Sequence, residues 1–371
     1  MKKKKQDRRL AWFTSGATEL PAVTLDSYNM EVRDAKGFIG DRASNRAFSD
    51  ILEEMRKAMR EVGDDPLGDK PTADMKKKAI DRFLLEGSLE AAGVVQGAIE
   101  EFAQELATVI RRFLKEEGWR RTQRIVVGGG LRDSRVGELA IGRTTAILKV
   151  EGKAIELVAI RNHPDKAGLI GVAHLVPPAM FSGHDAVLAV DIGGSNIRAG
   201  VLKLPKRRPL RLEKVTVWRM EHWRHADADP KPTRDEAVTR LAKMLKSLMD
   251  QAEKAGLKLV PFIGVGCPGS IEPDGSISQG GQNLPGNWES GRFNLAGELR
   301  DKIPRIGKEE TGVVLHNDAV VQGLSEAPHM TDVSRWGVLT IGTGLGNARF
   351  TNREIEAANP PARVKGKKRS G

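Results

Sequence analysis

The sequence predicts an α/β protein with two lobes, and three observations lead to this. The chain has 371 residues, enough for two ordinary domains that each bury a core. A hydrophobic content of 39% with 40 glycines fits a soluble α/β enzyme. Short apolar runs of strand length alternate with longer amphipathic stretches of helix length. No apolar run approaches the ~20 residues that span a bilayer, and no apolar segment follows the basic first residues as a secretory signal requires. We therefore expect a cytoplasmic protein.

Cysteine and charge exclude several further classes. The single cysteine, Cys267, cannot form an intramolecular disulfide, and there is no cysteine cluster to hold zinc. Of the net charge of +11, residues 1–9 and 363–371 carry +5 each, which leaves +1 for the rest. Two basic tails of this kind are either solvated ends or nucleic-acid arms. The nearly neutral body favours solvated ends and makes nucleic acid an unlikely partner.

The segment 186–204, AVLAVDIGGSNIRAGVLKL, carries the first chemical signal. An apolar run of strand length ends at Asp191, a glycine-rich turn at 193–195 follows, and a second apolar run returns. Glycines let the backbone approach a ligand closely. Backbone N–H groups in such a turn can cradle a phosphate, and the acid can hold a metal-bound water. The segment is thus either a plain β-hairpin or a phosphate-binding one.

The part of the chain before this hairpin reads as helices followed by a strand and helix pair. The apolar strand 124–127 leads into three glycines at 128–130, and a helix is expected over 134–148. A strand at 154–160 precedes DKAGLIGVA at 165–173, which reads as a helix with small residues for close packing. Weaker expectations are strands at 22–25 and 29–32, a helix over 46–61, a loop at 63–71, and a helical region over 72–117 broken near Gly87 or Gly93.

After the hairpin, strands again end at polar or glycine-rich turns. The strand 313–316 ends in Asn317-Asp318, where a helix begins, and the strand 336–341 runs into GTGLG at 342–346. A His- and Asp-rich loop at 222–232 is either solvated or metal-binding. Further expectations are a strand at 214–220, a helix over 234–255, a strand from 261 into the Pro-Gly turn 268–269, a compact loop at 283–288 and a helix over 293–303.

Five segments in order, DIGGSNIRAGV, GVGCPGSI, NLPGNW, HNDAVVQGLSE and LTIGTGLGNARF, resemble the ROK family of sugar kinases in the actin-like ATPase superfamily. The three glycines at 128–130 with DKAGLIGVA are similar to that family's adenosine motif and last helix. The resemblance covers about 187–350 and 125–173. It implies a two-lobed actin-like ATPase (ribonuclease H-like) sugar-kinase fold.

Two features depart from the family pattern. The adenosine motif and last helix precede the first phosphate motif here, whereas they follow the second one in the family; a circular permutation accounts for this order. The family's G-E-x-G-H segment and cysteine-rich zinc loop have no counterpart, so no zinc is expected. The implied division is 1–45, a tail and large-lobe segment; 46–185, the family's C-terminal part; 186–310, the small lobe; 311–350, the catalytic and second phosphate segment; and 351–371, a basic tail.

The resemblance implies an ATP-dependent hexose kinase, glucokinase-like and acting on the 6-OH, with ATP and Mg²⁺. A kinase for an N-acetylated hexose and a non-catalytic sugar sensor of the same family are alternatives. The sequence leaves open whether the protein forms a homodimer, and no membrane partner is expected. The implied residues are Asp191, Gly193, Gly194, Ser195, Gly342, Thr343, Gly344, Gly128, Gly129 and Gly130 for ATP and its phosphates, with Mg²⁺ held by Asp191 through water; Asn317, Asn283 and Gly269 for the sugar; and Asp318 for catalysis.

Asp318 is the predicted base that accepts the proton of the attacking hydroxyl, and Asn317 is predicted to hydrogen-bond the sugar. Both stand where a strand ends and a helix begins, a usual place for ligands in α/β sheets. Both are also good helix caps, so a purely structural role is the alternative.

Overall fold

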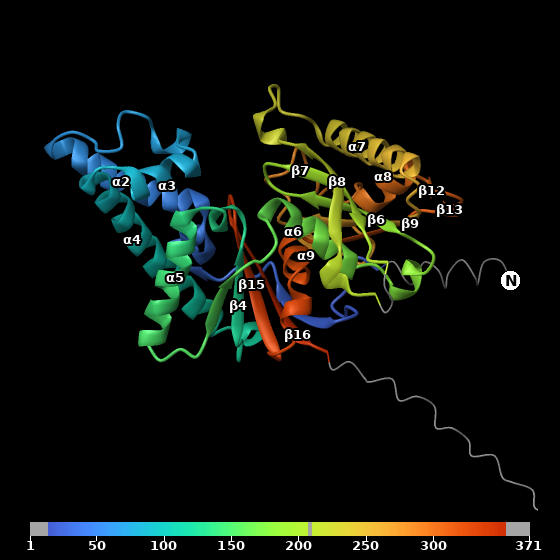
Figure 1. Cartoon of the computed structure of the whole chain (residues 1–371), viewed down its shortest axis with the longest axis horizontal. Coiled ribbons are helices and arrows are strands. Elements are labelled where there is room, and N and C mark those ends of the chain that lie inside the picture. Colours follow the sequence, from blue (N-terminus) through green and yellow to red (C-terminus); the bar gives the residue numbers. More distant parts are fainter. Residues whose placement is uncertain (1–13, 207–209, 354–371) are drawn as a thin grey trace, which may run out of the picture.

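The computed structural model describes residues 14–206 and 210–353, so the two basic tails at 1–9 and 363–371 lie outside the described residues. The chain forms two lobes, each built on a five-stranded sheet (Figure 1). In the described residues, no helix is both long and apolar enough to cross a bilayer.

The small-lobe sheet has the order β14-β9-β6-β7-β8. Its central strand β6 is buried at every residue, which explains the unbroken apolar run in the sequence. β6 is antiparallel to β7 and parallel to β9, and β14 continues the parallel part. Two helices pack their apolar stripes onto one face of this sheet. The elements are β6 (Ala186–Ile192), β7 (Ile197–Lys203), β8 (Thr216–Trp223), β9 (Leu259–Cys267), β14 (Gly312–Asn317), α7 (Arg234–Lys254) and α8 (Leu295–Lys302).

The large-lobe sheet has the order β1-β16-β15-β4-β5. Its core includes the long stripe of α4 with side chains from α2, α3 and α5, and these helices gather on one side of the sheet (Figure 1). The elements are β1 (Val23–Tyr28), β16 (Leu345–Asn352), β15 (Arg335–Ile341), β4 (Arg124–Gly128), β5 (Glu156–Ala159), α2 (Asn45–Val62), α3 (Lys77–Glu86), α4 (Leu89–Phe113) and α5 (Arg135–Val150).

The two sheets share one topology. In the small lobe, β6 and β7 form a hairpin, β8 pairs with the outer side of β7, and β9 and β14 extend the other side in parallel. In the large lobe, β15 and β16 form the hairpin, β1 pairs with β16, and β4 and β5 extend the other side in parallel. The strand β1, which corresponds to β8, precedes its hairpin in the chain instead of following it. Two such sheets define the actin-like, ribonuclease H-like fold that the sequence predicts.

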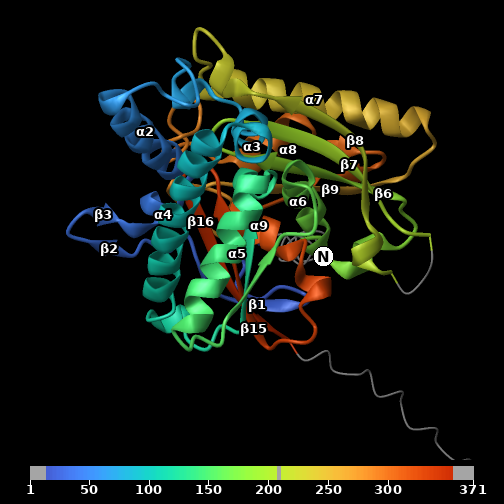
Figure 2. The same cartoon turned by 60° about the vertical axis from the view of Figure 1, so that its left-hand side comes forward.

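Two short helices, α6 (Pro164–Gly171) and α9 (Asp318–Leu324), pack together between the sheets (Figure 2). Gly171 permits their contact, because a Cβ at this position would overlap the carbonyl oxygen of Val321. Side chains from both helices belong to a core that also holds residues of both sheets, including Val187 and Val338. The two helices therefore fix one lobe against the other.

Most expected elements are present, with two differences. Residues 29–32 are not a strand; they lead into a small hairpin of β2 (Arg33–Asp34) and β3 (Gly37–Phe38). The helical region over 72–117 breaks at Gly87, where Ser88 caps α4, whereas Gly93 lies inside α4. The Ser88 hydroxyl accepts a hydrogen bond from the Ala91 N–H, which starts the new helix. The remaining short strands are β10 (Ser270–Ile271), β11 (Ile277–Gln279), β12 (Arg305–Ile306) and β13 (Glu309–Glu310).

Candidate active site

Asp191 lies near the end of β6 and is almost completely buried. Its register partner on β7 is Arg198, whose Nη1 donates to Asp191 Oδ2 at 3.2 Å. The other guanidinium nitrogen, Nη2, donates to Oδ1 of Asp165 on α6 at 2.6 Å. Burial raises the pKa of Asp191, and the positive charge of Arg198 opposes this rise. Arg198 thus places one cation between two carboxylates.

Helix α6 packs directly onto the Asp191 carboxylate. A Cβ at Gly168 would stand 2.5 Å from Asp191 Oδ1, so only glycine leaves room for the carboxylate there. This contact explains the glycine in the DKAGL segment. The same contact brings the segment at 165–173 to the end of β6, so it lies beside the carboxylate that precedes the first glycine turn.

The glycine turn after Asp191 is held by the loops around it. The Gly193 N–H donates to the carbonyl oxygen of Asn196 at 2.8 Å, and the His225 ring lies 3.0 Å from the Gly193 oxygen. A Cβ at Gly194 would lie 3.1 Å from the Cβ of Asn283. The structure therefore brings Asn283, a predicted sugar contact, against the first glycine turn.

Asn317 ends β14 and caps α9. Its Oδ1 accepts hydrogen bonds from the N–H groups of Ala319 and Val320, at 3.0 and 3.3 Å. Its Nδ2 donates to the carbonyl oxygen of Gly269 at 2.9 Å, which joins two residues of the predicted sugar site. The helix-cap role that the sequence left open is thus real for Asn317, and its contact with a sugar remains a prediction.

Asp318, the first residue of α9, has a half-buried carboxyl group. Burial and, after it, the nearby charge of Asp191 raise the pKa of Asp318 from 3.8 to about 7. Backbone hydrogen bonds oppose the rise, the larger effect coming from the Ala319 N–H, which lies 2.9 Å from Asp318 Oδ1. A carboxyl group with this pKa changes its charge near neutral pH, which suits a general base.

The large lobe contributes two glycine segments that lie side by side. Gly128 pairs with Thr340 across the parallel strands β4 and β15. Gly129 has a φ of 83°, which favours glycine, and it packs against the backbone of Ile341. The turn at 342–344 is closed by a hydrogen bond of 2.9 Å from the Gly342 N–H to the Gly344 oxygen. A permuted order of motifs requires this adjacency.

Polar side chains link the two lobes beside these glycines. The His163 ring lies 3.4 Å from Asp133 Oδ2 and 3.8 Å from Asp165 Oδ2. Asp133 follows the segment 128–130, and Asp165 also binds Arg198. Asp133, His163, Asp165 and Arg198 therefore form a chain of polar side chains that reaches Asp191.

Sequence reasoning missed four residues of this region. Arg198 had a signal, since it is a charged residue inside an otherwise apolar return strand, and Asp165 and His163 adjoin the DKAGL segment. Lys77, whose Nζ lies 2.6 Å from the point where a Cβ of Gly130 would stand, had none. It is one of three consecutive lysines at the start of a helix, and only the tertiary structure distinguishes it from Lys76 and Lys78.

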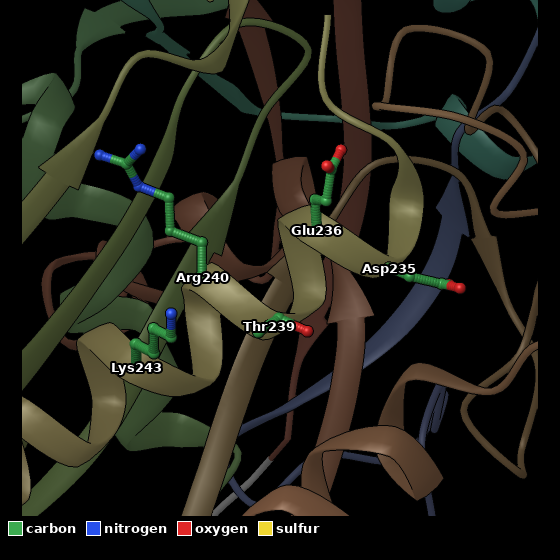
Figure 3. A pocket seen from close by; sticks show the side chains of 5 residues that line it. All are labelled: Asp235, Glu236, Thr239, Arg240 and Lys243. Carbon is green, nitrogen blue, oxygen red and sulfur yellow. The ribbon is translucent and has the colours of Figure 1, made fainter.

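Two surface hollows lie on the small lobe. One, of about 540 Å³, is lined by Asp235, Glu236, Thr239, Arg240 and Lys243 on α7 (Figure 3). The second, of about 350 Å³, adjoins it between α7 and β8. None of the residues lining either hollow is a predicted site residue, so the hollows do not coincide with the candidate active site.

The strand order and the paired glycine hairpins define a two-lobed α/β protein of the actin-like class. No protein-family model matches the chain, and no curated protein matches it. Solved structures of ROK-type and other sugar kinases are similar to part of it. A protein of Cytophaga hutchinsonii assigned provisionally as a sugar kinase is 18% identical, with a TM-score of 0.34, over 45% of this chain and 48% of that one.

Two further structures belong to the same group. A protein of Listeria monocytogenes assigned provisionally as an N-acetylmannosamine kinase is 25% identical, with a TM-score of 0.33, over 45% of this chain and 47% of that one. A ROK hexokinase from Thermus thermophilus is 24% identical, with a TM-score of 0.31, over 44% and 45%. The chain thus matches about half of the length of each of these structures. At these TM-scores the fold class rests on the strand order.

Proposed function

We propose that this protein is an ATP-dependent sugar kinase that transfers the γ-phosphoryl group to a hydroxyl of a hexose. The observation that carries the proposal is the pair of carboxyl groups of Asp191 and Asp318. Asp191 lies near the carboxyl end of β6 and Asp318 directly follows β14, and these two strands run in the same direction on either side of β9. Ligands of open α/β sheets bind at the carboxyl ends of such strands.

The two carboxyl groups have different environments, which supports different roles. Asp318, with a pKa raised to about 7, accepts the proton of the sugar hydroxyl as its oxygen attacks the γ-phosphorus and the bond to the leaving ADP breaks. Asp191 is held by Arg198 at 3.2 Å. Its carboxylate would orient a metal-bound water on the phosphate side. Asn283 and the Asn317–Gly269 pair border the sugar.

ATP and a divalent cation fit the residues present. A Cβ at Gly344 would meet no atom within 4 Å, and one at Gly342 or Gly193 would meet only a carbonyl oxygen at 3.7 Å, so these turns leave open space beside their backbone. Within the described residues no group of three or more His, Cys, Asp or Glu could hold a metal ion. In this proposal Asp191 is the residue that would hold Mg²⁺ through water, and the ion would neutralise phosphate charge.

The acceptor in this proposal is a hexose with a free 6-OH, with an N-acetylated hexose as the second candidate. The loop at 283–288 and the segment from His316 support a hexose by their resemblance to the family's sugar-binding segments. The family's G-E-x-G-H segment, whose Glu and His hold the anomeric end of the sugar, has no recognisable counterpart in the sequence at 1–50 or 347–371.

A coupled ADP-release assay over hexoses and N-acetylhexosamines, with Mg²⁺ and ATP, tests the proposal. We expect sugar-dependent release of ADP with at least one hexose. Calorimetry with the same sugars serves as the second arm. A protein that binds a hexose but releases no ADP with any of them is a sensor and not a kinase, and one that binds none of them refutes both readings.

The strand order also supports a circular permutation. If β1 is placed after β16, both sheets read hairpin, third antiparallel strand, then two parallel strands. The adjacency of Gly128 and Thr340 agrees with this reading, because it brings the adenosine motif beside the second phosphate turn.

A further inference from the structure

The start of α3 points one lysine at the triple-glycine segment. The Nζ of Lys77 lies 2.6 Å from the point where a Cβ of residue 130 would stand, so the ammonium group occupies the space that glycine leaves free. The Nδ2 of Asn45, at the start of α2, lies 3.7 Å from the same point. The Asn45 N–H in turn donates to the Gly342 carbonyl oxygen at 2.9 Å. Two helices of the large lobe thus bring polar side chains to both glycine segments.

The position of the Lys77 ammonium group is unfavourable for its positive charge. Burial lowers its pKa, and a cation in the first turn of a helix is unfavourable to the helix dipole. The described residues offer it neither a hydrogen bond nor an ion pair within 4.0 Å. Asp133, Asp165 and Asp81 raise its pKa from a greater distance. Two of these are already engaged, since Asp165 accepts from Arg198 and Asp81 from the Val136 N–H.

The side-chain amide of Asn45 also has an unsatisfied hydrogen-bond acceptor. Its Oδ1 is buried and accepts no hydrogen bond within the described structure. A buried amide oxygen without a hydrogen-bond donor is destabilising, so a ligand donor in this position is favoured. A site with donors at Lys77 Nζ and Asn45 Nδ2 and an acceptor at Asn45 Oδ1 suits a phosphate linked to a hydroxyl-bearing sugar.

We propose that Lys77 and Asn45 bind the nucleotide, with Lys77 Nζ and Asn45 Nδ2 donating to its phosphate chain beside Gly130 and Asn45 Oδ1 accepting from its ribose. This inference rests on the proposed function and assigns two residues to the nucleotide that the family motifs do not include. A bound phosphate would give the Lys77 ammonium group the close anionic partner that the described residues do not provide. The hydrogen bond from the Lys77 ammonium group to a phosphate is charge-assisted. It is made to the phosphate chain whose γ-phosphoryl group is transferred in the proposed reaction.

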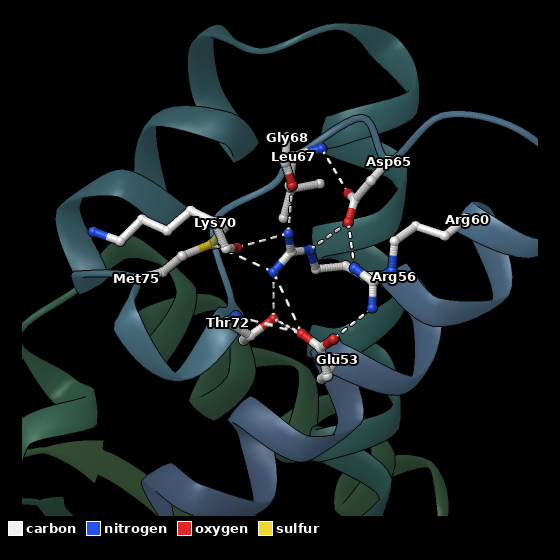
Figure 4. A network of polar contacts seen from close by, with 9 residues as sticks. All are labelled: Glu53, Arg56, Arg60, Asp65, Leu67, Gly68, Lys70, Thr72 and Met75. Carbon is white, nitrogen blue, oxygen red and sulfur yellow. Dashed lines mark hydrogen bonds and ion pairs between the residues drawn. The ribbon is translucent and has the colours of Figure 1, made fainter.

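A buried arginine fixes the segment from which Lys77 extends. The guanidinium of Arg56 on α2 is fully buried and donates to Asp65 Oδ2 at 2.9 Å and to the Gly68 and Lys70 oxygens at 2.7 and 2.9 Å (Figure 4). It also donates to Thr72 Oγ1 at 2.6 Å. Because Thr72 lies five residues before Lys77, this network ties the segment that precedes α3 to α2, the helix that begins at Asn45. The two proposed ligands therefore come from segments that are joined through Arg56.

Calorimetric titration of the full chain with ATP, ADP, adenosine and inorganic tripolyphosphate tests the inference. In Lys77→Met we expect affinity for ATP, ADP and tripolyphosphate to fall by about 10- to 100-fold, the range for a lost hydrogen bond to a charged group. Adenosine affinity should stay within about twofold, and Lys77→Arg should recover part of the loss because it keeps the charge. Lys78→Met is the matched control, since Lys78 is the next residue of α3 and is exposed; it should leave all four affinities unchanged.

The outcomes separate this inference from the proposed function. If the wild type binds ATP and Lys77→Met binds it equally well, the inference is wrong and the kinase proposal is untouched. An equal loss for adenosine and ADP would mean that Lys77 only supports the fold. If the wild type phosphorylates no sugar but binds tripolyphosphate in a Lys77-dependent way, the inference holds and the kinase proposal fails. A wild type that binds neither ATP nor tripolyphosphate overturns the inference.

Discussion

Arg198 and Asp191 are register partners on β7 and β6, and the Nη1 of Arg198 donates to Asp191 Oδ2 at 3.2 Å. The same guanidinium binds Asp165 of α6, which follows the triple-glycine strand in the chain. One side chain of the β6–β7 hairpin therefore ties together two motifs that are distant in sequence order. It also supplies the positive charge that opposes the rise in the pKa of Asp191 caused by burial.

Arg198→Met should weaken catalysis through Asp191. Without the guanidinium, the pKa of Asp191 rises further, because burial and the charge of Asp165 are then unopposed by it. We expect turnover at pH 7 to fall by at least about tenfold, which is 1.36 kcal/mol of activation free energy. The acid limb of the pH–rate profile should move to higher pH. Steady-state kinetics from pH 5.5 to 9 measures both effects.

Arg198→Lys is the companion variant, because it keeps one charge but cannot bridge Asp191 and Asp165 together. It should show an intermediate rate with a smaller displacement of the acid limb. An unchanged profile in Arg198→Met would mean that Asp191 does not depend on Arg198 for its ionisation.

The contact between α6 and α9 predicts a stability effect far from any ligand. Gly171→Ala places a Cβ on the Val321 carbonyl oxygen, so the helices must separate. Overpacking of this kind costs about 1–3 kcal/mol. Gly93→Ala in α4 is the matched control, since its Cβ would meet no atom within 4 Å, and it should stabilise the protein by about 0.5–1 kcal/mol. Urea denaturation of both variants measures the difference, and opposite signs are expected.

The Arg56 network predicts a second stability effect. Arg56→Met removes a fully buried cation and leaves the nearly buried Asp65 carboxylate without one of its two ion pairs, so we expect a loss of about 3–5 kcal/mol. Arg60→Met removes the other partner of Asp65 from an exposed position and should cost clearly less. Equal denaturation midpoints for the two variants would contradict the importance assigned to the buried guanidinium.

The elements that the sequence predicted well are those with strong local signals. Strand β6 reads as one apolar run because both of its faces are buried, and the hairpin β15–β16 is marked by its glycines. The positions of Asp191, Asp318 and the glycine turns followed from motif order. Residues whose role depends on distant packing gave no local signal: Lys77 differs from Lys78 only by facing Gly130. Likewise, the cap role of Asn317 became clear only from its hydrogen bonds with the N–H groups of Ala319 and Val320, and its contact with a sugar stays a prediction.

Asp318→Asn separates the catalytic from the structural role of this residue. The cap of α9 comes from Asn317, so the fold should survive the change. Loss of a general base lowers the rate by about 10²–10⁴-fold, and we expect sugar-dependent ADP release to fall at least a hundredfold at pH 8. A variant that turns over normally would remove Asp318 from the base role.

The same variant makes a prediction about stability and pH. Because the pKa of Asp318 is raised from 3.8 to about 7 in the folded protein, its contribution to stability is fully present below pH 3.8 and is lost as pH rises through about 7. Asn cannot ionise and loses nothing, so the urea midpoint of Asp318→Asn relative to the wild type should be more favourable at pH 8 than at pH 5. Asp250→Asn, at an exposed position on α7, should show no such difference between the two pH values. If Asp318→Asn behaves like Asp250→Asn, the carboxyl group is not held near neutrality by burial and Asp191, and a pH–rate profile with an acid limb near pH 7 would then need another group.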